Sequence, residues 1–154
     1  MLDVFVEAGQ QAGIPFTKDF NGKSQEGVSR YEHTIRGSKR CSAARGYLRP
    51  ALKRKNLHTQ TDVTVERIEF EGKKATGVTF SLNGKSVTVE ANREVILSAG
   101  ALNSPQILLR SGVGPADEIK PHGLEVVHEL AGVGRNLQDH YGVCLLYTSP
   151  SPRD

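Results

Sequence analysis

The chain has 154 residues, the length of one ordinary domain, and its hydrophobic and charged fractions of 37% and 24% are typical of a globular protein. The formal net charge is only +3, and Lys and Arg are spread from Lys18 to Arg153 without an evident stripe, which argues against a nucleic-acid partner. No apolar run approaches the roughly 20 residues of a membrane span, and nothing after Met1 resembles a signal peptide, so we expect a cytoplasmic protein.

Apolar residues at helical spacing predict a helix from residue 2 to residue 12, which Gly13 closes. The polar, glycine-punctuated residues 16–39 predict a long surface loop with one strand near residues 28–35. Ser42 is placed to cap a short helix that Pro50 then stops.

Three runs typical of β-strands follow, over residues 61–70, 74–82 and 85–91. Asn83-Gly84 is a strong signal for a tight hairpin, so these runs predict an antiparallel meander. Residues 95–97 differ from them because all three are apolar, which predicts a strand covered on both faces, as in a parallel sheet.

Ser104-Pro105 predicts the start of a helix, with Asn103 or Ser104 as its cap, and Gly112 and Gly114 end it. A second short helix over residues 116–123 is expected to lead to a strand over residues 125–130 and a Gly-rich turn. The order of elements favours the α/β fold class.

Ser98, Ala99 and Gly100 stand at the expected carboxyl end of the strand formed by residues 95–97. A doubly wound sheet places its ligand there, beside a helix N-terminus that favours an anion. Small residues allow a cofactor to approach the backbone, although a tight turn packed on the sheet is an equal alternative.

Other motifs are weaker. The segment GVG at residues 132–134 is not a full GxGxxG because Leu137 stands where glycine is needed. Asp139 and His140 are adjacent, so on an extended chain they point in opposite directions. The histidines have no metal or triad spacing, and Cys41 is better explained as a small packed residue than as a nucleophile. No catalytic or metal-binding residue is therefore expected.

The segment GALNSPQILLRSGVG, Gly100 to Gly114, resembles the second signature of the glucose-methanol-choline (GMC) family of flavin oxidoreductases. This signature needs a small pair, Ser-Pro two positions later, aliphatic residues and then Ser-Gly-aliphatic-Gly. The similarity extends from about Phe5 to Gly142, through EAGQQAGIPFTKDFNG, RCSAARGYLRPALKRKNL and GVGRNLQDH, and is greatest to the choline dehydrogenase branch.

The resemblance implies an incomplete Rossmann-like FAD-binding domain over residues 41–143, which contains the meander, and part of a substrate-side region over residues 1–40. It implies hydride transfer from choline or another primary alcohol to FAD. It leaves peripheral association of the full-length enzyme with a membrane open. The loop from Asp19 to Gly27 corresponds to part of the substrate-side region.

The resemblance also implies roles for single residues. Val65 matches the valine that holds the adenine ring of FAD through backbone groups. Ser98, Ala99 and Gly100 match the strand end that lies along the dinucleotide, and Asn136 and Asp139 match a turn near the cofactor.

The sequence lacks the GxGxxG fingerprint, the acidic ribose ligand and the catalytic histidine that the family is expected to use. We therefore expect an internal fragment that is inactive alone. The alternative is a non-catalytic α/β binding module derived from a flavoprotein core. An NAD-linked dehydrogenase is disfavoured because the Gly-rich loop and helix order do not match its fingerprint.

The last segment, CLLYTSPSPRD from Cys144 to Asp154, breaks abruptly with the preceding composition. Back-translated codon by codon, this segment can be encoded by DNA that resembles a transposase-type sequencing-library adapter. The alternative interpretation of the segment is a Ser/Pro-rich linker. We expect residues 144–154 to be non-native, so that Cys144 and Tyr147 carry no function. Cys41 then remains as the native cysteine, and no disulfide framework is expected.

Overall fold

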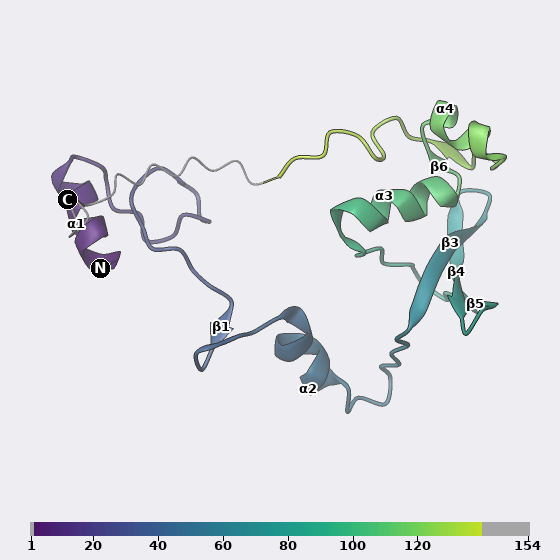
Figure 1. The fold of residues 1–154 in the computed structure, drawn as a ribbon, viewed down its shortest axis with the longest axis horizontal. Coiled ribbons are helices and arrows are strands. Elements are labelled where there is room, and N and C mark those ends of the chain that lie inside the picture. The colour runs from purple at the N-terminus through teal and green to yellow at the C-terminus, as the bar shows by residue number, and fades with distance from the viewer. Residues whose placement is uncertain (1, 140–154) are drawn as a thin grey trace, which may run out of the picture. The chain divides into compact units, whose positions relative to one another are not determined.

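The computed structural model describes residues 2–139, which form two compact units, residues 2–59 and residues 60–139 (Figure 1). The boundary expected between residues 40 and 41 separates functional regions rather than compact units, and it stays a prediction. His140 and the expected non-native tail lie outside the described residues.

The first unit begins with helix α1, Leu2–Gln11, as predicted. Gly13 follows with a φ of 88°, and its N–H donates to the Gln10 carbonyl at 3.0 Å. Packing around this helix is sparse: Phe5 is 70% exposed, and Val28 is the only buried hydrophobic residue among residues 2–59.

A loop follows α1, as predicted, but the strand expected near residues 28–35 is wrong. Val28 makes a single parallel bridge with Phe16. The strands of this unit are the two-residue β1, Ile35–Arg36, and β2, Lys39–Arg40, which pair antiparallel. All four of their residues are exposed, so no apolar face is buried that would stabilise a longer strand.

The short helix after Ser42 comprises a π-helical turn η1, Ala44–Leu48, and α2, Arg49–Ala51. Ser42 Oγ accepts a long hydrogen bond, 3.4 Å, from the Arg45 N–H. The expectation that Pro50 stops the helix is wrong. Pro50 lies in α2, and the helical run from η1 continues through it to Ala51.

The second unit contains the predicted antiparallel meander, with strands β3, Val63–Glu71, β4, Lys74–Leu82, and β5, Lys85–Glu90 (Figure 1). β4 is central, and β3 and β5 are the edges. Asn83 and Gly84 have φ values of 51° and 77°, so the turn has the two positive φ angles of a type I′ hairpin.

Helix α3, Gly100–Arg110, packs against β3 and is followed by β6, Val113–Gly114. Helix α4, Ala116–Ile119, and the 3₁₀ turn η2, Lys120–His122, then lead to β7, His128–Glu129. β7 pairs parallel with β6, so the predicted helix and strand after α3 are both present. The core of this unit is formed by Ile68, Ile107, Val113, Ile119 and Val133.

α3 begins at Gly100, four residues before the predicted start at Ser104. Ser104 is not the cap: it lies inside the helix, and its Oγ accepts a hydrogen bond at 3.0 Å from the N–H of Ala99, the residue before the helix. Pro105 therefore lies in the second turn, where its ring nitrogen cannot donate a helical hydrogen bond.

Residues 95–97 do not form the predicted buried strand. Among the described residues no strand pairs with them, and Ile96 is 79% exposed while Val95 and Leu97 are half-buried. A strand covered on both faces needs neighbouring strands and helices, and residues 60–139 do not supply them at this place. Within this part of the chain, parallel pairing is confined to β6 and β7.

Candidate functional site

A cavity of about 330 Å³ lies in the second unit between β3, β4, the segment before α3 and α3 itself. It brings together three of the site residues predicted from the sequence, Val65, Ser98 and Ala99. The complete lining is Val65, Ile68, Val78, Val95, Ile96, Leu97, Ser98, Ala99 and Ile107.

An irregularity in β3 builds the sheet wall of this cavity. Val65 and Ile68 are three residues apart, so strict alternation would place them on opposite faces of the sheet. The register with β4 shifts between Val65 and Arg67, and this extra residue allows both Val65 and Ile68 to line the cavity.

Helix α3 supplies the opposite wall through Ile107, which is 8% exposed. Ser111, just after the helix, ties the two walls together. Its Oγ accepts a hydrogen bond from the Ile68 N–H at 2.8 Å and donates one to the Ile107 carbonyl at 2.5 Å.

Ser98 and Ala99 lead into α3, whose first residue is Gly100. Ser98 is exposed and Ala99 half-buried, and Gly100 has a φ of 89° that favours glycine. A Cβ placed on Gly100 would meet no atom within 4 Å, so the space in front of it is open.

The N-terminus of α3 is adjacent to this open space. Ala99 is its N-cap residue and has no side chain that could accept hydrogen bonds from the first-turn amides. These amides carry the positive end of an 11-residue helix, which favours an anionic group.

The cavity lining contains no ionisable side chain. It can therefore bind and orient a ligand, but it cannot take up or release a proton. β3 is an edge strand, so part of its backbone N–H and C=O groups point away from β4 and are placed to meet a ligand. Valine and isoleucine side chains offer an apolar surface to a flat ring.

The remaining predicted residues, Gly100, Asn136 and Asp139, are not in this lining. Asn136 and Asp139 are exposed and lie in the turn after β7. Part of that turn, Gly132 to Arg135 and Leu137, lines a separate cavity along α3 together with Leu102 and Pro105.

Sequence reasoning missed Ile68, Val78 and Ile107 as parts of the site. Each was expected only as part of a strand or helix. Alternation along a regular strand would have assigned Ile68 to the face opposite Val65, because the bulge leaves no clear signal in the sequence. The spacing of Ile107 from Ser111, one helical turn, was a usable signal for a shared helix face.

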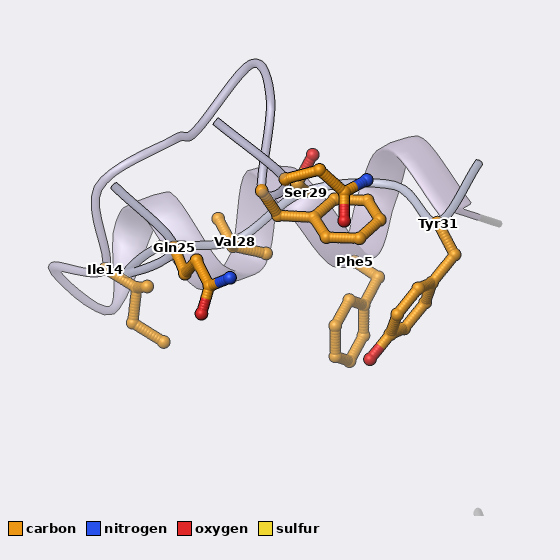
Figure 2. A pocket seen from close by; sticks show the side chains of 9 residues that line it. Phe5, Ile14, Gln25, Val28, Ser29 and Tyr31 are labelled. Carbon is orange, nitrogen blue, oxygen red and sulfur yellow. The ribbon is translucent and has the colours of Figure 1, made fainter. Parts of the chain in front are cut away.

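A second cavity, of about 500 Å³, lies within the first unit (Figure 2). The Phe5 and Tyr31 rings point the same way there, and the Phe20 and Tyr31 rings meet edge to face with centroids 5.4 Å apart. Asn21, Gln25 and Gly27 contribute to its lining, and they come from the loop expected on the substrate side.

Residues 2–139 hold no group of three or more His, Cys, Asp or Glu side chains arranged to bind a metal ion. In the same part of the chain, no helix is long and apolar enough to cross a membrane.

The sequence profile of the GMC oxidoreductases matches residues 1–142. The chain belongs to the GMC oxidoreductase family. Among curated relatives of this GMC protein, the mitochondrial choline dehydrogenase of Homo sapiens is 49% identical over 148 residues, which cover 96% of this chain and 25% of that protein. The oxygen-dependent choline dehydrogenase of Brucella anthropi is 45% identical, with 99% and 28% covered. The chain thus spans about a quarter of these relatives.

Two solved structures are also similar to this GMC chain. Pyridoxine 4-oxidase from Mesorbium loti matches with a TM-score of 0.76 and 36% identity, covering 90% of this chain and 27% of that one. An FAD-dependent oxidoreductase from Chaetomium thermophilum matches with a TM-score of 0.77 and 33% identity, covering 89% and 24%. The expected mixed helix-and-sheet class is confirmed.

Proposed function

We propose that this GMC chain is part of an FAD-dependent oxidoreductase that oxidises a small alcohol by hydride transfer to the flavin. One observation carries the proposal: a single cavity joins Val65 on the edge strand β3 to Ser98 and Ala99 at the start of α3. The relatives named as choline dehydrogenases and as an FAD-dependent oxidoreductase support it.

The groups around the cavity suit a flavin dinucleotide. An apolar wall with Val65 and Ile68 accepts an adenine ring, and backbone groups of the edge strand β3 can bind its polar rim. The open space at Gly100 and the N-terminus of α3 suit a phosphate-bearing chain. FAD, when bound, supplies the acceptor for the hydride.

In this proposal the chain's own residues bind and orient the cofactor. Asn136 and Asp139 are proposed to approach the cofactor from the turn after β7. Because no ionisable side chain lines the cavity, the group that takes the alcohol proton comes from outside the lining.

Choline is the first alcohol to test because the curated relatives carry it in their names, and pyridoxine is the second. The loop at Asn21 and Gln25 is proposed to belong to the substrate side. The cytoplasmic location stays a prediction, and the human relative is named as mitochondrial.

The test uses the full-length protein that contains this chain, purified and scanned for flavin absorbance before and after choline is added without oxygen. We expect about one FAD per protein, bleached by choline. Ala99→Leu fills the cavity and should lower the FAD content severalfold. Ala44→Leu, on an exposed residue of η1 in the first unit and outside the lining, should not.

Bound flavin that no alcohol reduces would favour the non-catalytic binding module instead. Equal FAD contents in the Ala99→Leu and Ala44→Leu proteins would contradict the placement of the cofactor.

A further inference from the structure

Ser111 joins the two walls of the cavity at one atom. Its side chain is buried, at 7% exposure, and its Oγ contacts the backbone of β3 on one side and of α3 on the other. The partners are the N–H of Ile68 and the carbonyl of Ile107, and both isoleucines line the cavity.

The bond to Ile68 satisfies a backbone donor on the free edge of the sheet. β3 pairs with β4 on one side only, and Ile68 lies just beyond the bulge that brings Val65 into the cavity wall. Without the Ser111 hydroxyl, the N–H of Ile68, in a residue that is 6% exposed, loses its partner in a buried place.

The end of α3 does not depend on this hydroxyl. The backbone N–H of Ser111 donates to the carbonyls of Ile107 and Leu108, both at 3.0 Å. The Gly112 N–H donates to the Leu109 carbonyl, also at 3.0 Å. Removing the hydroxyl therefore breaks the link between the walls and leaves the helix end in place.

We propose that Ser111 is a positioning residue for flavin binding: its hydroxyl fixes the spacing between the β3 wall with Val65 and the α3 wall with Ile107. This inference rests on the proposed function. Ser111 does not line the cavity, so it acts through Ile68 and Ile107 and not by contact with the cofactor.

The experiment compares Ser111→Ala, Ser111→Thr and the control Ser86→Ala in the full-length protein. Ser86 is an exposed serine that also makes a cross-strand hydrogen bond, to Glu66. The readouts are the FAD dissociation constant, the visible circular dichroism of bound flavin and the unfolding midpoint of the FAD-free protein.

Loss of the link should weaken FAD binding on the order of tenfold in Ser111→Ala and change the flavin dichroism, because the walls are no longer held at one spacing. Ser111→Thr keeps the hydroxyl and should restore both readouts. Ser86→Ala should match the wild type. If Ser111→Ala does not fold, Ser111→Cys, which has a slightly larger side chain and makes weaker hydrogen bonds, is measured in its place with the same expectation.

A wild-type dissociation constant and flavin spectrum in Ser111→Ala, with only a lower unfolding midpoint, would overturn the inference and leave a purely structural serine. Failure of Ser111→Thr to restore binding would also overturn it. A wild-type protein that binds no FAD would instead refute the proposed function, and this inference with it, so the two failures are distinguishable.

Discussion

Thr79 is the most enclosed polar residue of the meander, at 2% exposure. Its Oγ1 donates a hydrogen bond to the Glu69 carboxylate on β3 and lies 2.7 Å from the Thr88 Oγ1 on β5. Arg67 pairs with the same carboxylate, with Nε 2.8 Å from Oε1. One hydroxyl therefore connects all three strands on the polar face of the sheet.

Replacing Thr79 with valine keeps the shape and removes this connection. We expect the free energy of unfolding to fall by about 1–3 kcal/mol, because Glu69 and Thr88 lose a buried partner. The control is Thr64→Val on the exposed side of β3, expected within roughly 0.5 kcal/mol of the wild type. Urea unfolding of the full-length protein measures both, and equal midpoints for the two variants would refute the connecting role.

At the scale of the element, Gly112 sets the path from α3 into β6. Its φ is 81°, and a Cβ there would overlap the Glu125 carbonyl oxygen and press on Val127. Gly123, after η2, has a similar φ of 71° but open space around it. Substituting alanine at Gly123 therefore tests the positive φ alone, whereas substituting it at Gly112 tests the positive φ together with steric overlap.

Gly112→Ala should lower the unfolding midpoint clearly more than Gly123→Ala. The second change carries only the cost of a positive φ, roughly 1–2 kcal/mol, whereas the first adds the overlap with Glu125 and Val127. Thermal unfolding of the two full-length variants checks this order. Equal losses would show that the loop holding Glu125 moves away freely.

Elements with local signals were predictable. The alternation in β3 to β5 and the Asn83-Gly84 turn fixed the meander, and Gly112 marked the end of α3, because each depends on neighbours in sequence. The start of α3 was not predictable in this way, since Ser104 lies inside the helix and its Oγ accepts a hydrogen bond from the N–H of the N-cap residue Ala99. The site was predicted in part, through Val65, Ser98 and Ala99, while Ile68 joined it through a bulge that has no sequence signal.

Residues 95–97 show why the predicted parallel strand failed. Three apolar residues in a row are typical of a strand that is covered on both faces, and residues 60–139 do not provide the neighbouring strands and helices that such a strand needs.

We expect Ile96→Lys to reduce aggregation of the isolated chain severalfold, because Ile96 is 79% exposed there. Light scattering at matched concentrations measures this, with Thr64→Lys as the control, and an equal effect of both changes would mean that net charge alone is responsible.

At the scale of the whole molecule, the chain covers only 25% to 28% of the curated relatives. We expect the isolated chain, residues 1–143, to retain far less than one FAD per protein and to show no alcohol-dependent reduction. Visible absorbance after gel filtration with excess FAD measures this. A stoichiometric yellow complex that choline reduces would show that these residues suffice.

The location of the cofactor is tested most directly by hydrogen–deuterium exchange of the full-length protein with and without FAD. We predict slower exchange in peptides that contain Val65 and Ser98 to Gly100 when FAD is bound, and unchanged exchange in β5, which lies at the far edge of the meander. Protection that spares Val65 and residues 98–100 while FAD is bound elsewhere would contradict the account.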